Sequence, residues 1–437
     1  MRHWGFFNAT NYFLMIIVIA LLNSLVVGSF SFLIWKKADV SIRHFFWPAL
    51  SLKLLAGVSL GLVYKYYYTA NDTFLFFDDA KVVTALARED IIHYVQFLWR
   101  ADESFPVWSD LVNVQPRSLF FVKILSFFNL LTDDNYWLSS IWFSFLSFLG
   151  CWYLFHKLTQ WLMGAKWPSA LSLLFFPSFV FWGSGIIKES VSIGALCFII
   201  GFVLLLVQKQ KPRIWEWVLV VISSHILWSL KYYWAAVLFP TLITSLIMLY
   251  GVLPFVKLRG RVQLLIWTIL FLMICFGVSF VHPNFYLERL LGVVVENYNL
   301  FALASKPEGM IHYDHLSATW LSMFLNAPWA IFSGLFRPFI FESVNLLHVV
   351  SGIENLFLFI VFIMSLGNLK LIPFSPFRLI IFGAIVYVLL LCAFLAISTP
   401  NLGTLSRYRI GFLHIFLLLA LYQNPLIQKI PFFKKQY

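Results

Sequence analysis

The sequence predicts an all-α, polytopic membrane protein, with residues 1–437 forming a single integral membrane domain of about 11 transmembrane helices. Two observations carry this prediction. Of the 437 residues, 61% are hydrophobic and only 11% are charged, and the mean hydropathy is +0.86. A soluble domain has roughly 25% charged residues, so this chain has too little polar surface to cover a soluble globule. The composition therefore excludes a soluble enzyme, a disordered chain and a disulfide scaffold.

The apolar stretches locate the candidate spans, because a transmembrane helix needs about 20 mostly apolar residues. Stretches that qualify lie at residues 11–35, 45–65, 137–155, 167–187, 188–207, 215–230, 232–251, 263–281, 346–366, 379–398 and 410–423. Two further apolar stretches, 119–131 and 317–341, are short or interrupted. The second contains Pro328, Gly334 and Pro338, which interrupt a regular helix. We expect re-entrant or interfacial helices at these two places.

The positive charges predict the orientation, since loops on the cytoplasmic side collect Lys and Arg. If the loop that holds Lys36, Lys37 and Arg43 lies inside, alternation of the spans places thirteen more basic residues inside: Lys157, Lys166, Lys209, Lys211, Arg213, Lys257, Arg259, Arg261, Lys370, Arg378, Lys429, Lys434 and Lys435. The N-terminus is therefore predicted outside and the C-terminus in the cytoplasm. Because topology explains the net charge of +12, we expect no nucleic-acid partner.

Two long polar segments fall on the predicted outer side of the membrane. Residues 66–136 form the first large outer loop, and residues 282–345 form the second, which includes the re-entrant or interfacial segment. Loops that helix packing does not require often carry function. The outer face is therefore the predicted working face.

The first outer loop contains an acidic pair, Asp78-Asp79, preceded by two phenylalanines and followed by Ala80 and Lys81. Adjacent carboxylates at a membrane rim are costly to place and rarely needed for packing. Together they can bind a divalent cation, or one can act as a general base. The structural alternative is that one of them caps a helix that begins at Ala80. A second pair, Asp133-Asp134, is at least as compatible with capping the next span as with catalysis.

Charged residues also enter the apolar part of the chain near residues 177–190. Pro177, Gly183 and Gly185 interrupt the helical pattern there, and Lys188 and Glu189 follow the interruption. Adjacent residues on a helix do not face each other, so each of these two charges is expected to bind a different partner.

The basic residues on the predicted acidic side, where topology does not require them, include Lys231, Arg337, Arg407 and Arg409. The guanidinium fork suits phosphate oxygens, so this group predicts a phosphate site at the outer rim. Glu354 is a further candidate partner. In the second outer loop, the segment His312-x-Asp314-His315 is compatible with a metal site, but its spacing differs from H-E-x-x-H and favours an exposed loop.

These features resemble the GT-C superfamily, the integral-membrane glycosyltransferases that use sugars linked to polyprenyl phosphate. The resemblance rests on the number of spans, the outer arginines and these segments: Phe77-Asp78-Asp79-Ala80, Phe176-Pro177-Ser178, Trp182-x-Ser184-Gly185, Lys188-Glu189, Phe336-Arg337-Pro338-Phe339 and Arg407-Tyr408-Arg409. The acidic loop follows the second predicted span, whereas the family normally places it after the first. No phosphate-binding glycine motif for a nucleotide donor is present in the sequence.

The resemblance implies an enzyme that moves a sugar, with inversion, from a polyprenyl-phosphate lipid to a glycan, lipid or protein acceptor. The site would face the periplasm or the lumen. In a bacterium the protein would lie in the inner membrane, in contact with the membrane lipids, and its site would face the periplasm. Asp78 or Asp79 would be the base or a ligand of a divalent cation (Mg²⁺ or Mn²⁺), with no other cofactor. The donor phosphate would be held by Lys188, Arg337, Arg407 and Arg409, and further substrate contacts would come from Lys81, Trp182, Glu189 and Lys231.

Two other functions remain open on the sequence. A polysaccharide polymerase or ligase also has many spans and outer arginines, but it consumes lipid-diphosphate glycans. A flippase or transporter of lipid-linked sugars is expected to have inverted repeats and broken helices in matching positions.

Overall fold

The computed structural model describes residues 3–68, 71–342, 346–367 and 377–429, without the side chains of residues 3–13, 377, 428 and 429. The predicted charges Lys370, Lys434 and Lys435 and the end of the second outer loop at residues 343–345 lie outside these ranges. All regular secondary structure in the described ranges is helical, and an isolated bridge joins Met310 to Asn401. The prediction of an all-helical protein is confirmed.

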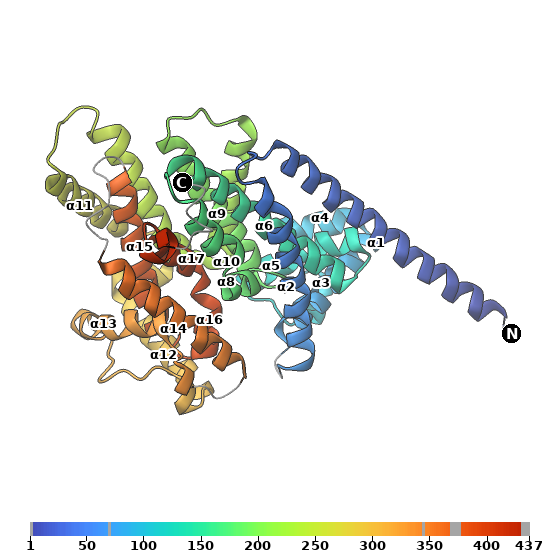
Figure 1. Ribbon diagram of the computed structural model, residues 1–437. Coiled ribbons are helices and arrows are strands. Elements are labelled where there is room, and N and C mark those ends of the chain that lie inside the picture. The colour runs from blue at the N-terminus through green and yellow to red at the C-terminus, as the bar shows by residue number, and fades with distance from the viewer. Residues whose placement is uncertain (1–2, 69–70, 343–345, 368–376, 430–437) are drawn as a thin grey trace. The chain divides into compact units, whose positions relative to one another are not determined.

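The helices follow one another along the chain with short connections (Figure 1). Their bounds are α1 His3–Lys37, η1 Arg43–Phe45, α2 Phe46–Tyr66, α3 Asp72–Glu89, α4 Ile91–Trp99, η2 Pro106–Asp110, α5 Pro116–Thr132, α6 Tyr136–Trp161, α7 Lys166–Ala170, η3 Leu171–Phe175, α8 Pro177–Trp182, α9 Lys188–Val207, α10 Ile214–Leu246, η4 Ile247–Val252, α11 Gly260–Val278, η5 Pro283–Phe285, α12 Leu287–Ala304, η6 Pro307–Gly309, α13 Trp320–Phe336, η7 Ile340–Glu342, α14 Leu346–Leu366, α15 Phe377–Ser398, α16 Leu402–Tyr408, α17 Ile410–Leu421 and α18 Pro425–Lys429.

Many of these helices can cross a membrane. In the described part of the chain, eight are long and apolar enough: Leu14–Lys37, Arg43–Tyr66, Tyr136–Trp161, Lys188–Val207, Ile214–Val252, Gly260–Val278, Leu346–Leu366 and Arg378–Ser398. The pair α16 and α17, bent by 70°, gives a ninth if it counts as one span. The chain is therefore a polytopic helical membrane protein. Helix α13 has 17 residues and is shorter than these spans.

Three of the predicted spans need correction. Residues 167–187 do not form one helix, because Phe176 is extended and Pro177 begins a new short helix, so the stretch divides into α7, the π-helical turn η3 and α8. After α8 the chain turns at Gly185, whose φ of +72° favours glycine. The two spans predicted at 215–230 and 232–251 are instead one helical stretch of 39 residues, kinked at Lys231.

The chain divides into two compact units, each described here by itself. Unit 1 comprises residues 1–152 and 180–195, and unit 2 comprises residues 153–179 and 196–437. The division passes through α6, α8 and α9, so each of these helices contributes residues to both units.

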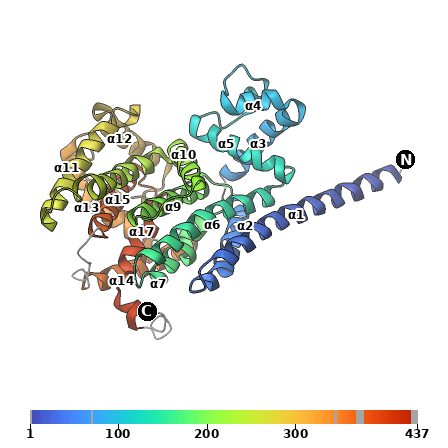
Figure 2. The ribbon, with the colours of Figure 1, turned by 90° about the horizontal axis from the view of Figure 1, so that it is seen from above.

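Unit 1 combines apolar helices with a small helical group formed by the first polar segment. In that group α3 packs against α4 and α5, as Figures 1 and 2 show. The apolar helices approach each other closely where they carry glycine, as small residues allow in membrane proteins. Gly57 of α2 lies against Ser140 and Ser144 of α6, and Ser140 donates a hydrogen bond to its carbonyl oxygen. Gly150 of α6 lies against Gly194 of α9.

Unit 2 is organised around α15 and α17. Helix α15 packs against α10, α11, α12, α13 and α17 (Figure 2). A helix that is apolar on all sides belongs to a protein core or a membrane span, and every residue of α17 from Ile410 to Leu417 is buried inside the protein. Trp234 of α10 fills the space beside Gly411, and the Tyr387 hydroxyl of α15 donates to the Gly411 carbonyl at 3.0 Å. These contacts fix the start of α17.

We expect Gly150→Ala to destabilise the protein. The added Cβ would overlap the Gly194 carbonyl oxygen and lie 2.6 Å from its carbon, and overpacking of this kind costs about 1–3 kcal/mol. The variant should lose monodisperse protein at a lower temperature when heated in detergent and analysed by size exclusion. Gly28→Ala is the matched control, because no atom of the described residues lies within 4 Å of a Cβ at that position. Equal midpoints for the two variants would contradict this account of the α6–α9 contact.

Candidate functional site

The acidic pair lies within α3 and does not begin a helix. Helix α3 runs from Asp72 to Glu89, with Asn71 at its N-cap position. The interpretation of Asp78 or Asp79 as a cap is therefore wrong, because the helix begins several residues earlier. Consecutive residues on an α-helix point about 100° apart, so the two carboxylates enter different surroundings.

Asp79 is buried and holds a loop. Its side chain is 3% exposed and accepts hydrogen bonds from the Val112 amide at 3.1 Å and from the Asn113 amide and side chain, each at 2.8 Å. Both carboxylate oxygens take part in these bonds. Three donors replace the water that a buried carboxylate loses, so Asp79 anchors the connection between η2 and α5 to α3.

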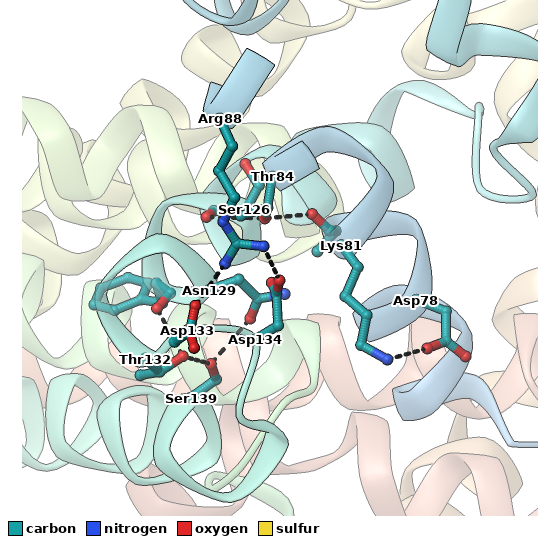
Figure 3. Close-up of polar contacts among 12 residues, drawn as sticks. Asp78, Lys81, Thr84, Arg88, Ser126, Asn129, Thr132, Asp133, Asp134 and Ser139 are labelled. Carbon is teal, nitrogen blue, oxygen red and sulfur yellow. Dashed lines mark hydrogen bonds and ion pairs between the residues drawn. The ribbon is translucent and has the colours of Figure 1, made fainter. Parts of the chain in front are cut away.

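Asp78 is on the exposed side of the same helix. Its side chain is 65% exposed and forms an ion pair of 3.0 Å with Lys81, one turn further on. The Lys81 ammonium also lies over the Phe77 ring, 4.9 Å from its centroid. Figure 3 shows this pair on α3, apart from the polar group around Arg88. Of the two acids, Asp78 is the one that can meet a substrate.

The two carboxylates do not form a shared cation site. Both carboxylate oxygens of Asp79 accept hydrogen bonds from the loop at residues 112–113. The Asp78 carboxylate points away from Asp79 and toward Lys81. Among the residues that the structure describes, no group of three or more His, Cys, Asp or Glu side chains could hold a metal ion. The geometry does not fit the cation that the resemblance implies, so no chemical step below depends on one.

The second acidic pair stabilises the fold. Arg88 of α3 donates to Asp134 at 2.5 Å and to Asp133 at 3.1 Å (Figure 3). Both acids have positive φ values, 50° and 54°, in the turn after α5. Asn135, rather than either acid, accepts hydrogen bonds from the first amides of α6. The predicted cap was therefore assigned to the wrong residue of this turn.

Lys188 lies with the polar segment of unit 1. It is the first residue of α9, donates to the Ser118 hydroxyl of α5 at 2.8 Å and lies 4.7 Å from the centroid of the Phe76 ring. Glu189 and Trp182 are buried in the same unit. The four predicted phosphate ligands are thus divided, with Lys188 in unit 1 and the three arginines in unit 2.

Arg409 is the most unusual ionisable residue of unit 2. It lies at the bend between α16 and α17 and is 1% exposed. Its Nη1 donates weakly to the Arg337 carbonyl, at 3.4 Å. Its Nε and Nη2 atoms are buried and have no hydrogen-bond partner among the described residues. The side-on edge of this guanidinium is therefore unsatisfied within the described chain.

Two more cations gather around the residue next to Arg409. The buried ammonium of Lys231, at the kink of α10, lies 4.2 Å from the centroid of the Tyr408 ring. Arg407 lies 5.2 Å from the same centroid. A tyrosine face attracts cations, so the ring of Tyr408, the residue before Arg409, has both Lys231 and Arg407 against it.

Glu354 acts on Arg409 electrostatically, but its carboxylate oxygens accept hydrogen bonds from another residue. It accepts hydrogen bonds from the Ser178 amide, at 2.9 Å, and from the Ser178 hydroxyl, at the start of α8. Glu354 therefore offsets some of the charge of Arg409 without filling its unsatisfied edge.

Arg337 differs from Arg409, because its fork is occupied. It binds Glu342 through two bonds of 2.7 and 3.0 Å and lies 5.5 Å from the centroid of the Trp329 ring. This arrangement favours a role in positioning its neighbours over direct binding of phosphate.

Comparisons with protein-family models, with curated proteins and with solved structures find no match. The functional argument therefore depends on the geometry of the chain's own residues.

Sequence reasoning missed the partners that distinguish these charges. Asn113 and Val112 are remote in sequence from Asp79, and nothing in their own neighbourhood marks them as its ligands. Tyr408 lies between two arginines in the sequence, and this arrangement could have indicated that its ring contacts cations. His312, Asp314 and His315 are exposed residues of a loop, as predicted.

We expect Asp79→Ala to be much less stable than Asp78→Ala. The first loses three hydrogen bonds to a buried carboxylate, and bonds to charged groups contribute about 1.5–3 kcal/mol each. The second loses one exposed ion pair, which contributes about 0–1 kcal/mol. Limited proteolysis should cleave the segment around residues 100–115 faster in Asp79→Ala, and its thermal midpoint should fall. Indistinguishable cleavage rates in the two variants would contradict the anchoring role.

Proposed function

We propose that this chain is an integral-membrane glycosyltransferase of the GT-C type, which uses a sugar linked to polyprenyl phosphate. The observation that carries the proposal is Arg409, a guanidinium buried in an apolar helical unit, two of whose nitrogens have no hydrogen-bond partner in the part of the chain that the structure describes. Burial of an unpaired charge is costly. A buried charge without a partner in its own chain is retained chiefly where a ligand binds to it.

The free edge of Arg409 suits a phosphate. Nε and Nη2 lie on one side of the planar guanidinium and can donate in parallel to two oxygens of one anion. Lys231 and Arg407, which lie against the ring of the neighbouring Tyr408, add positive charge to this part of the same unit. A polyprenyl phosphate carries its anion on a lipid, so it can reach a site among membrane helices from the bilayer.

In the proposed reaction the acceptor hydroxyl oxygen attacks the anomeric carbon of the donor sugar and inverts it. The bond from that carbon to the phosphate oxygen breaks, and its electron pair remains on the phosphate. The hydroxyl proton passes to Asp78, the exposed carboxylate of α3. Cations fixed in a site without water stabilise the charge that develops on the departing phosphate. Lys81 would contact substrate beside Asp78.

The charge distribution supports an orientation for this reaction. With the N-terminus outside and the C-terminus in the cytoplasm, residues 66–136 and 282–345 belong to the outer side. In a bacterium this side is the periplasmic side of the inner membrane. The acceptor would be a glycan, a lipid or a protein.

Arg409→Met tests the phosphate site. We expect transfer from a panel of synthetic polyprenyl-phosphate hexoses and pentoses to fall at least about 100-fold, the usual effect of removing one stabilising donor. The thermal midpoint should stay equal or rise, since an apolar residue replaces an unsatisfied charge. Arg409→Lys should restore little activity, because an ammonium lacks the fork. Farnesyl phosphate should raise the midpoint of the wild type but not of Arg409→Met.

The control for this experiment is Arg100→Ala, which removes an exposed cation, 85% accessible, from unit 1. It should leave transfer unchanged. A large fall in the midpoint of Arg409→Met would indicate a structural arginine and contradict the proposal.

Asp78→Asn tests the proposed base. The expected result is a loss of transfer of about 100-fold or more, with the folded protein recovered in full yield. Asp102→Asn removes another exposed acid of unit 1 and should have no effect. Full transfer by Asp78→Asn would contradict the assignment. Consumption of lipid-diphosphate glycans alone would favour the polymerase or ligase, and movement of labelled lipid without a covalent product would favour the flippase.

A further inference from the structure

A polar pocket lies beside α13 in unit 2. It has a volume of about 600 Å³ and lies between the segment of residues 312–319 and the first part of α13. His312, Asp314 and His315 are exposed on one side of it, and Leu325, Asn326 and Trp329 line the other. The Trp329 side chain is 43% exposed. Trp329 also lies against Arg337, and the other residues named here have no role in the phosphate site described above.

The pocket is formed in advance by hydrogen bonds from one face of α13. Ser322, Asn326 and Trp329 are spaced so that they share this face. Their side chains donate to the carbonyl oxygens of His315, Asp314 and His312, at 3.2, 3.4 and 3.2 Å. Because these donors hold the backbone of the loop, its side chains are left to face solvent.

The opposite side of the same segment is anchored in unit 2. The Ile311 amide donates to the Pro400 carbonyl at 2.9 Å, and Met310 pairs with Asn401. Met310, Ile311 and Tyr313 are buried, whereas His312 and Asp314 are exposed. The loop is therefore fixed on both sides, as a specific binding site requires.

The lining has the chemistry that binds a carbohydrate ring. An exposed indole offers a flat apolar face for the C–H groups of a sugar, and a carboxylate and imidazoles offer acceptors for its hydroxyls. His312 Nε2 is 2.9 Å from the Pro307 carbonyl oxygen. If it donates there, Nδ1 is the acceptor that remains for a hydroxyl.

The pocket is also connected to the phosphate site within unit 2. The Trp329 ring lies against the Arg337 guanidinium, and the Arg337 carbonyl accepts from Arg409. The connection runs through Arg337, whose own guanidinium is occupied by Glu342, and the lining of the pocket does not include Arg409. We therefore assign a ring in the pocket to the acceptor and not to the donor sugar bonded to the phosphate.

We infer that the pocket at His312, Asp314, His315 and Trp329 binds a ring of the acceptor glycan. The inference rests on the proposed glycosyltransferase function. It narrows the acceptor to a carbohydrate and assigns its recognition to residues remote from Asp78.

The experiment uses four variants of the full chain in lipid nanodiscs: Trp329→Ala, Trp329→Phe, Asp314→Asn and Trp320→Ala. Trp329→Phe keeps an aromatic face for the sugar and for Arg337. Trp320→Ala is the matched control, because Trp320 is on the same helix and 49% exposed but does not line the pocket. Binding to a printed array of mono- and oligosaccharides is measured without donor lipid, and transfer is measured with varied donor and acceptor.

We expect the wild type to bind a defined set of glycans. Trp329→Ala and Asp314→Asn should bind them at least tenfold more weakly, whereas Trp329→Phe and Trp320→Ala should stay close to the wild type. In transfer, Trp329→Ala should raise KM for the acceptor and leave KM for the donor unchanged.

Three results separate the inference from the function on which it rests. Active transfer with an unchanged acceptor KM in Trp329→Ala would overturn the pocket and leave the proposed function standing. Failure of the wild type to bind any carbohydrate would also overturn the pocket. Glycan binding that depends on Trp329, with no transfer from any polyprenyl-phosphate sugar, would overturn the proposed function and the assignment of the sugar as an acceptor.

Discussion

The unsatisfied edge of Arg409 is the constraint on which the architecture of unit 2 depends. A guanidinium can be held inside an apolar unit only if the surrounding backbone fixes it. Asn401 caps α16 and pairs with Met310, which sets the direction of that helix. Trp234 and Tyr387 then hold Gly411 just after the 70° bend. These contacts aim the arginine while leaving its donors to a ligand.

In unit 1 the periodicity of one helix, α3, separates two neighbouring charges. Adjacent carboxylates repel each other, yet α3 directs Asp79 inward to three donors and leaves Asp78 at the surface beside Lys81. The buried acid fixes the loop before α5, and Ser118 at the start of α5 receives Lys188. The inner member of the pair thus orders the surroundings in which the outer member can act.

Hydropathy predicted most of the membrane helices because the bilayer requires long apolar stretches, and it failed where backbone geometry breaks a stretch without changing its polarity. Residues 167–187 are apolar throughout but are interrupted at Phe176 and Pro177. Charge sorting found Lys231, Arg407 and Arg409, since their charges conflict with the predicted topology. Charge sorting could not distinguish Arg337 from Arg409, because the two residues differ only in the fold: a carboxylate binds the guanidinium of Arg337, and none binds that of Arg409 among the described residues. Asp79 was misread for the same reason: its donors come from a distant loop.

The contrast between Arg337 and Arg409 also explains why α13 ends where it does. Glu342 binds the Arg337 fork and accepts from the Phe339 amide at 2.8 Å, so the chain turns sharply after the helix. This turn presents the Arg337 carbonyl to Arg409 while Trp329, two turns earlier, supports the Arg337 guanidinium. Arg337, whose guanidinium is paired with Glu342, therefore positions Arg409, whose Nε and Nη2 have no hydrogen-bond partner among the described residues. The same helix carries, on its preceding turns, the donors that shape the sugar pocket. Helix α13 thus links the carbohydrate pocket to Arg409 through the Arg337 carbonyl, and transfer between two bound substrates requires that their sites be held in a fixed geometry.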